Sequence, residues 1–318
     1  MLNIAASTRL VGSAATQSEP GRQVTPKSRW SPRRGWELIA FLPLVVAFLT
    51  PASWPRWAWM WLVCLAVYFG CKWLTWRRTS VAGIIRWKAA AYLFAWPGLD
   101  ADAFLQSGSS SRISNPNARE WIFAAAKTAF GALMIWLVPN LVRSESVIIQ
   151  GWIGMIGIVF LLHFGLFHLL SCLWRACGID AKPLMDWPIA ATSVSDFWGR
   201  RWNRAFRDLT HRFLFRPLTS WFGPRWGLAA GFLFSGLVHE LVITVPARGG
   251  YGGPTSFFAI QAAAMLIERS RSGRRVGLGK GIAGWAFTVI ALLAPAGILF
   301  PVPFLANIIL PFINALGS

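Results

Sequence analysis

Long apolar runs recur along this chain, and the gaps between them are rich in lysine and arginine. Of the 318 residues, 55% are hydrophobic and only 14% are charged, whereas soluble domains average about 25% charged residues. The hydrocarbon core of a bilayer is crossed by about 20 residues of helix, and several runs approach that length. The pattern therefore predicts an all-α, polytopic membrane protein rather than soluble domains.

The apolar runs predict about seven to eight transmembrane helices. They lie near residues 37–50, 57–74, 121–141, 147–174, 226–246, 255–268, 283–300 and 304–314. The shorter runs must tilt or be lengthened by their flanks to span. Residues 81–96 are aromatic and basic but too short to span, which predicts an interfacial amphipathic helix. Residues 100–118 predict a polar linker.

The basic residues divide unevenly when the N-terminus is placed in the cytoplasm and the spans alternate. The inward segments are then 1–36, 72–120, 175–225 and 268–280. They contain every Lys and Arg of the chain except Arg56, Lys127, Arg143 and Arg248. Cytoplasmic loops carry such an excess of positive charge, so the pattern predicts a multi-pass protein of the bacterial inner membrane or the endoplasmic reticulum. The net charge of +19 comes without a nucleic-acid-binding motif, and no nucleic-acid partner is expected.

The domain organisation follows from the same pattern. Residues 1–36 predict a disordered basic cytoplasmic tail, with a transit peptide as the alternative, and residues 37–318 predict a single transmembrane domain. The four cysteines lie within or beside apolar runs and lack the spacing of zinc or redox motifs. They are Cys64, Cys71, Cys172 and Cys177. We expect buried thiols, no disulfide framework and no metal site.

His239 is the strongest candidate for a catalytic residue. It lies thirteen positions into the apolar run that starts at Trp226, or roughly 20 Å along a helix. Ionisable side chains at membrane depth mark functional sites by default, and apolar surroundings favour a neutral imidazole, which can act as a general base. Ser235, four residues earlier on the same helical face, can orient the ring. The alternative is that His239 only hydrogen-bonds a neighbouring helix.

The other ionisable residues near apolar runs carry weaker expectations. Glu240 points about 100° away from His239 around a helix, so we expect it to be protonated or paired with an arginine from another helix. His163 and His168 are five residues apart and face different ways, which is poor spacing for a shared metal. His211 is expected to be a solvated surface residue.

Residues 193–216 predict a basic amphipathic helix at the cytoplasmic interface, capped by Ser195 or Asp196. Its aromatic stripe consists of Trp198, Trp202, Phe206 and Phe213, and its basic residues are Arg200, Arg201, Arg204, Arg207 and Arg212. Arginine forks suit phosphate groups, on an anionic substrate or on anionic lipid. The amide of Asn203 can stabilise an oxyanion or serve as a structural hydrogen-bonder.

Two motifs carry a family resemblance. The segment Ser195–Asn203, followed by Arg216-Pro217 and then by Phe234–Glu240, resembles the wax synthase branch of the membrane-bound O-acyltransferases, over residues 185–270. The resemblance implies transfer of a fatty acyl group from acyl-CoA to a lipid alcohol, giving a wax ester or a sterol ester. It also implies that His239 is the catalytic histidine and that Asn203 is the motif asparagine.

These expectations define a candidate site and leave two alternative functions open. The expected catalytic residues are His239 and Asn203, and the expected substrate-binding residues are Trp198, Arg200, Arg201, Trp202, Arg204 and Ser235. Acyl-CoA would be a co-substrate, a lipid alcohol the acceptor and membrane lipid the surroundings, with no bound cofactor. The alternatives are O-acetyl transfer to a polysaccharide or small metabolite, and a lipid or solute transporter whose histidine relays protons.

Overall fold

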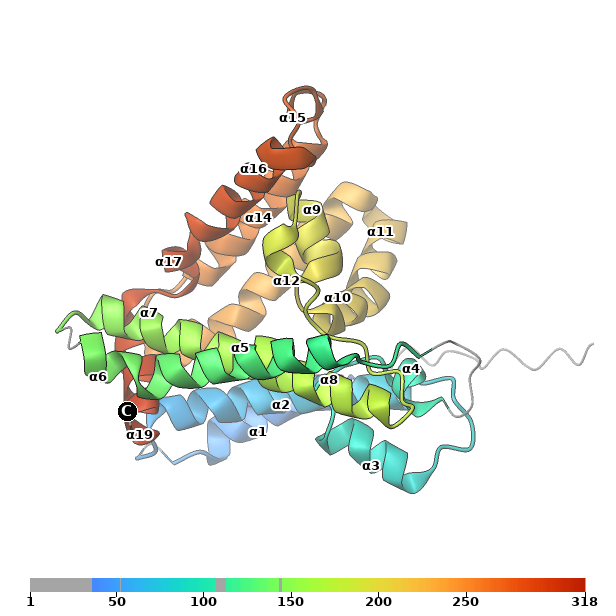
Figure 1. Cartoon of the computed structure of the whole chain (residues 1–318). Coiled ribbons are helices and arrows are strands. Elements are labelled where there is room, and N and C mark those ends of the chain that lie inside the picture. Colours follow the sequence, from blue (N-terminus) through green and yellow to red (C-terminus); the bar gives the residue numbers. More distant parts are fainter. Residues whose placement is uncertain (1–35, 52, 107–112, 143–144, 318) are drawn as a thin grey trace, which may run out of the picture. The chain divides into compact units, whose positions relative to one another are not determined.

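The structure is a computed structural model that describes residues 36–51, 53–106, 113–142 and 145–317. Every regular element among these residues is a helix (Figure 1). The all-α class expected from the apolar runs is therefore confirmed. The predicted basic tail lies outside the described residues, apart from Trp36.

The first half of the chain begins with helices that precede the two motifs. They are α1 (Glu37–Leu49), α2 (Arg56–Arg77), α3 (Arg86–Phe94), α4 (Ala101–Leu105), α5 (Ala118–Trp136) and α6 (Val138–Val142). A long helix follows, composed of α7 (Val147–Ile158), the π-helix η1 (Val159–Leu166) and α8 (Phe167–Ala176).

The second half contains both motifs. The first motif region comprises η2 (Pro188–Ala190), α9 (Val194–Asp196), the π-helix η3 (Phe197–Arg201), α10 (Arg204–Thr210), the π-helix η4 (His211–Phe215) and α11 (Arg216–Phe222). The second lies in α12 (Pro224–His239), the π-helix η5 (Glu240–Thr244) and α13 (Val245–Ala247). The chain ends with α14 (Gly253–Arg269), α15 (Arg271–Arg275), α16 (Gly281–Leu293), α17 (Ala296–Leu299), α18 (Val302–Phe304), the π-helix η6 (Leu305–Ile309) and α19 (Leu310–Ala315).

Four helical stretches of the described chain are long and apolar enough to cross a bilayer, which indicates a membrane protein. They are Arg56–Arg77, Val147–Ala176, Pro224–Ala247 and Gly281–Leu299. Length and apolarity thus support four spans and not the expected seven to eight. Two further apolar helices, Glu37–Leu49 and Val302–Ala315, are shorter than a bilayer core. The helix α14 has only 17 residues, and α5 carries the charged residues Glu120 and Lys127.

Glycines allow the apolar helices to approach each other closely. A Cβ atom added to Gly131 of α5 would lie 2.3 Å from the backbone nitrogen of Leu161 in η1. A Cβ atom added to Gly157 of α7 would lie 2.7 Å from the side chain of Ile135 in α5. The helix α5 therefore lies directly along α7 and η1 (Figure 1), which is the close packing that small residues permit between membrane helices.

The expected polar linker at residues 100–118 is in part a buried helix. Phe104 in α4 is fully buried, and its ring contacts the rings of Tyr92, Trp96 and Trp174. Asp100 caps the start of α4 by accepting a hydrogen bond from the backbone N–H of Ala103. The rings around Phe104 come from α3, from the residues after α3 and from α8, and the composition of residues 100–118 alone does not reveal these contacts.

Lys72 is another departure from the sequence expectation. It was counted with the cytoplasmic segment 72–120, at the end of the second span, but α2 continues to Arg77 and buries Lys72 completely. Its side-chain nitrogen donates a hydrogen bond to the carbonyl oxygen of Gly98 (2.5 Å) and lies 3.6 Å from the centre of the Tyr92 ring. The buried polar group thereby has a hydrogen-bond acceptor.

Residues 193–216 do not form the single amphipathic helix that was expected. The cap is Ser193, whose hydroxyl accepts a hydrogen bond from the N–H of Asp196, and neither Ser195 nor Asp196 has that role. The helical path then breaks because Trp202 is extended and Asn203 has a left-handed backbone with φ of 41°. A new helix, α10, starts after this break.

The segments expected to share one side of the membrane do contact one another. Arg212 forms an ion pair with Asp102 (3.3 Å), which joins segment 175–225 to segment 72–120. Arg269 donates a hydrogen bond to Ser195 (2.9 Å), which joins segment 268–280 to segment 175–225. These contacts join three of the four basic segments, and the side of the membrane that the segments face stays a prediction.

The four cysteines were expected to be buried, and the structure confirms this expectation only in part. Cys71 and Cys172 are buried and Cys64 is partly buried, but Cys177 is exposed. Cys177 follows the last residue of α8, where the helix has ended. All four are free thiols.

We predict that Gly131→Ala destabilises the protein, because the added methyl group would overlap the backbone of Leu161. Overpacking of this kind costs about 1–3 kcal/mol, and thermal unfolding of the purified protein measures it. Gly231→Ala is the matched control, since an added Cβ atom there meets no atom within 4 Å. Equal unfolding temperatures for the two variants would contradict the close approach of α5 and η1.

Candidate active site

His239 is the last residue of α12, and its ring is oriented by the main chain. The Nδ1 atom lies 2.7 Å from the carbonyl oxygen of Ser235, one helical turn earlier. A carbonyl oxygen only accepts hydrogen bonds, so Nδ1 carries the proton and donates it. In the neutral ring the lone pair is then on Nε2. Ser235 thus orients the ring as expected, although through its backbone carbonyl.

The His239 ring reaches the first motif through α14. Its centroid lies 4.6 Å from that of Phe258, a buried residue of α14. The ring of Phe258 in turn lies 5.6 Å from that of Trp198 in the first motif. The indole nitrogen of Trp198 also donates a hydrogen bond to Gln261 (3.3 Å), a fully buried amide one turn further along α14. One face of α14 therefore contacts both motifs.

Glu240 ties the second motif to the start of α14. Its carboxylate accepts hydrogen bonds from the backbone N–H (3.1 Å) and the hydroxyl (3.0 Å) of Thr255, and from the hydroxyl of Thr244. The expected arginine partner is thus wrong, because Thr255 in the first turn of α14 and Thr244 of η5 supply the donors. Gly236 allows this close approach, since a Cβ atom there would lie 2.8 Å from the Cα atom of Thr255.

Glu268 ties the other end of α14 to the first motif. Its carboxylate is buried and accepts hydrogen bonds from the backbone N–H groups of Val194 (2.7 Å) and Ser195 (2.9 Å). These N–H groups belong to the first turn of α9 and need an acceptor.

The sequence analysis did not identify three residues of this site, Phe258, Gln261 and Glu268. A lone acid and a lone amide in the apolar run 255–268 are nevertheless a usable signal.

Two of the expected phosphate-binding arginines are engaged by a neighbouring acid. The Nε atoms of Arg200 and Arg201 donate to the two carboxylate oxygens of Asp196, at 2.7 and 2.5 Å. Partial burial raises the pKa of Asp196, but the hydrogen bonds from Arg201 and Arg200 outweigh it and hold this pKa below its ordinary value. Asp196 therefore remains ionised, and both pairs persist at neutral pH.

Asn203 has a structural role, which the sequence analysis gave as the alternative to oxyanion stabilisation. Its side-chain oxygen accepts a hydrogen bond from the backbone N–H of Phe206 (3.4 Å) and caps α10. Asparagine is among the residues that tolerate a left-handed backbone. The neighbouring Trp202 stacks on Phe197 and contacts Phe164 of η1. The amide nitrogen of Asn203 is the part of this side chain that can still serve a substrate.

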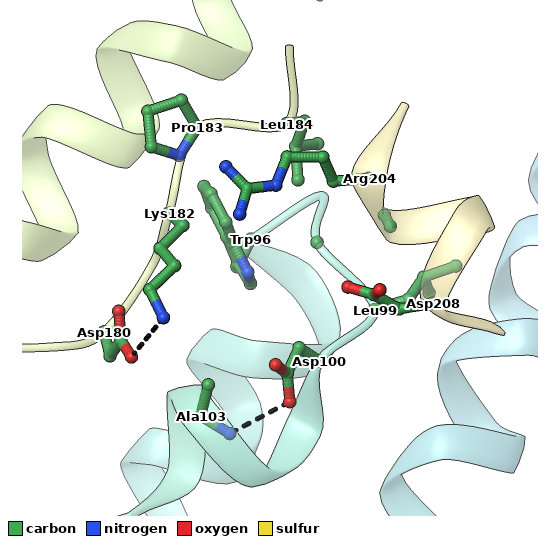
Figure 2. Close-up of a pocket in the computed structure, with 12 residues that line it drawn as sticks. Trp96, Leu99, Asp100, Ala103, Asp180, Lys182, Pro183, Leu184, Arg204 and Asp208 are labelled. Carbon is green, nitrogen blue, oxygen red and sulfur yellow. Dashed lines mark hydrogen bonds and ion pairs between the residues drawn. The ribbon is translucent and has the colours of Figure 1, made fainter. Parts of the chain in front are cut away.

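Arg204 lines a cavity of about 50 Å³ on the other side of the break at Asn203. Figure 2 shows the guanidinium of Arg204 beside the indole of Trp96, and the ammonium of Lys182 paired with Asp180. Three carboxylates also line the cavity, from Asp100, Asp180 and Asp208. Burial raises the pKa of Asp100, and the hydrogen bond from the backbone N–H of Ala103 offsets part of this rise. The mixed charge suits water or a small polar group better than a phosphate, and His239 is not among the lining residues.

The histidines of the long helix α7–η1–α8 do not form a pair. His168 contacts Lys127 (2.8 Å) and Glu120 (3.0 Å) of α5, whereas His163 contacts the ring of Phe167.

One cluster has ligand atoms close enough to hold a metal, and it consists of Glu120, His168 and Cys172. The guanidinium of Arg175, however, already bonds Glu120 and lies 3.6 Å from the sulfur of Cys172. A protein cation thus occupies the place between these groups. The exposed His211 stacks on Phe215.

Comparison with known proteins agrees with the motifs. Residues 181–260 match the model of the membrane bound O-acyl transferase family, a segment that contains both motifs. The chain is 34% identical over 136 residues to a long-chain-alcohol O-fatty-acyltransferase of Simmondsia chinensis. It is 28% identical over 169 residues to the probable long-chain-alcohol O-fatty-acyltransferase 8 of Arabidopsis thaliana. The resemblance inferred from the motifs is therefore confirmed.

The similarity covers only part of each protein. The first alignment includes 39% of this chain and 38% of its relative, and the second includes 49% and 50%. A third relative, the probable long-chain-alcohol O-fatty-acyltransferase 9 of Arabidopsis thaliana, is 39% identical over 75 residues, or 21% of this chain and 22% of that protein. The chain thus matches half or less of the length of these relatives.

We predict that Glu240→Gln destabilises the protein, because it weakens the carboxylate cap on α14. Loss of a hydrogen bond to a charged group costs about 1.5–3 kcal/mol, measurable as a lower unfolding temperature. Glu145→Gln removes an exposed acid outside the site and is the control. If the two variants unfold at the same temperature, Glu240 does not stabilise the contact between the second motif and α14.

Proposed function

We propose that this chain is a membrane-bound O-acyltransferase that transfers a fatty acyl group from acyl-CoA to a long-chain alcohol or another lipid alcohol. The observation that carries the proposal is the orientation of His239. Its Nδ1–H is held by the Ser235 carbonyl, so Nε2 is the basic atom, within a segment that matches the family. The names of the relatives support an acyl acceptor with a long alkyl chain.

In the proposed reaction, Nε2 of His239 accepts the hydroxyl proton as the alcohol oxygen attacks the thioester carbonyl carbon. A new C–O bond forms, and the carbonyl oxygen gains negative charge. When the carbonyl re-forms, the C–S bond breaks and the CoA sulfur leaves with the electron pair. The imidazolium returns its proton to that sulfur, so the products are an ester and CoA, and His239 is neutral again.

Asn203 supplies the proposed stabilisation of the negatively charged oxygen. Its side-chain oxygen is engaged at the start of α10, so only the amide nitrogen is a donor for substrate. Donors that point at the developing oxyanion contribute a large share of catalysis in acyl transfer. The contacts of Trp198 and Trp202 with neighbouring aromatic rings give the segment that carries Asn203 a fixed position.

The proposed membrane arrangement follows the sequence expectation. Besides the four long spans, we propose that α1, α5, α14 and the helix Val302–Ala315 cross or enter the bilayer, which gives the expected seven to eight spans. The N-terminus and the basic segments would face the cytoplasm, from which acyl-CoA arrives. The lipid alcohol would enter laterally from the bilayer. Arg200, which is exposed although paired with Asp196, and Arg204 would add to the attraction of the donor's phosphates.

We predict that His239→Ala reduces ester formation by about 10²- to 10⁴-fold, the usual contribution of general-base catalysis. Membranes containing the variant would be supplied with a labelled long-chain acyl-CoA and a fatty alcohol, and the wax ester quantified. His211→Ala, which removes an exposed histidine, should retain the parental rate. Ester formation by His239→Ala at the parental rate would refute the proposed mechanism.

We predict that Asn203→Asp reduces turnover by about 10²- to 10³-fold, as expected for loss of an oxyanion donor. Aspartate keeps the oxygen that caps α10 and has a similar size, but it lacks the amide donor. The unfolding temperature should therefore be retained while the rate falls. An unchanged rate would show that Asn203 serves only as a helix cap.

A further inference from the structure

A cluster of cations near the first motif has no part in the proposed chemistry. We define the cationic turn as residues 269–280, which include α15; its basic side chains are Arg269, Arg271, Arg274, Arg275 and Lys280. All five residues are exposed. The sequence from 269 to 318 contains no aspartate or glutamate. The preceding acid, Glu268, is buried and bonded to the start of α9. The turn therefore has no acid of its own to neutralise it.

The cationic turn is anchored against the segment that begins the first motif. Arg269 donates a hydrogen bond to the hydroxyl of Ser195 (2.9 Å). The α16 side of the turn is fixed as well, because the indole of Trp285 donates to the carbonyl of Ile189 (2.8 Å). The turn connects the ends of α14 and α16, with α15 at its tip (Figure 1). Its cations are thus held at a defined place beside the motif.

Three of these side chains have no intramolecular role among the described residues. The side chains of Arg271, Arg275 and Lys280 form no hydrogen bond or ion pair there. In contrast, those of Arg200 and Arg201 bind Asp196. Like charges gathered on one turn repel each other, and a bound polyanion relieves that repulsion. The chemistry of the turn therefore suits a ligand with several phosphate groups.

The distance from the turn to His239 fits a ligand with its phosphates far from its reacting atom. Arg269 follows Phe258 by eleven residues in the same helix, which corresponds to roughly 16 Å. Phe258 is the residue whose ring contacts His239. A ligand that reaches both places needs an arm of similar length between its phosphates and its thioester.

We propose that the cationic turn binds the phosphate groups at the nucleotide end of the acyl-CoA donor, while the thioester lies at His239. This inference rests on the proposed function. It assigns the main phosphate-binding role to Arg271, Arg275 and Lys280 rather than to the arginines of the first motif. Phosphates of anionic lipid headgroups share this chemistry, and the experiment separates the two sources.

The first measurement is binding of desulfo-CoA, an unreactive analogue, to the purified protein in vesicles of phosphatidylcholine. The test variant combines Arg271→Gln, Arg275→Gln and Lys280→Gln. Its Kd should rise about tenfold, since each exposed ion pair contributes up to about 1 kcal/mol. The control variant combines Arg56→Gln, Arg86→Gln and Arg225→Gln, which remove three exposed cations elsewhere, and should bind like the parent. An unchanged Kd in the test variant would overturn the proposal.

The second measurement compares two donors, acyl-CoA and S-acylpantetheine, which lacks the phosphates. The test variant should show about a tenfold higher KM for acyl-CoA, and a parental rate with S-acylpantetheine would show that it is folded. The test variant could instead lose activity equally with both donors, and only in vesicles that contain anionic lipid. That result would assign the turn to lipid headgroups and overturn the proposal. A parental protein that esterifies from neither donor would refute the proposed function, while the desulfo-CoA measurement would still decide whether the turn binds phosphates.

Discussion

The candidate site depends on two carboxylates, one at each end of α14. Glu240 accepts hydrogen bonds from Thr255 at the start of this helix, and Glu268 near its end accepts them from Val194 and Ser195 at the start of α9. Free N–H groups at a helix start are costly where water is scarce, and a negative charge there also interacts favourably with the helix dipole. The two acids thereby position α14 against both motifs.

The position of α14 determines how the catalytic histidine meets the first motif. Phe258 lies between His239 and Trp198, so a shift of α14 would change both contacts at once. The His239 ring is also held by the Ser235 carbonyl, within its own helix. Its tautomer therefore depends on local backbone geometry, whereas its distance from the first motif depends on long-range packing. The acid that comes directly after the histidine serves this packing.

Contacts set by helical periodicity could be predicted from the sequence, whereas contacts between distant segments could not. The contact of Ser235 with His239 is a consequence of their spacing of four residues. Thr255, which bonds Glu240, and Val194, which bonds Glu268, lie 15 and 74 residues away from these acids, and no local pattern identifies them. Irregular geometry caused the error in the first motif. The π-helix η3 and the left-handed Asn203 interrupt residues 193–216, so an aromatic stripe drawn on a regular helix does not exist there.

The arginines show why counting charges is insufficient to locate an anion site. Arg200 and Arg201 are the most prominent cations in the sequence of the first motif, yet Asp196 within the same motif engages both. A guanidinium that already binds a carboxylate gains less from a phosphate, because it must share or exchange its partner. The segment 269–280 contains no acid of its own, and the preceding Glu268 is buried and bonded to the start of α9. The distribution of the few acids therefore determines which of the many cations remain available to an anionic substrate.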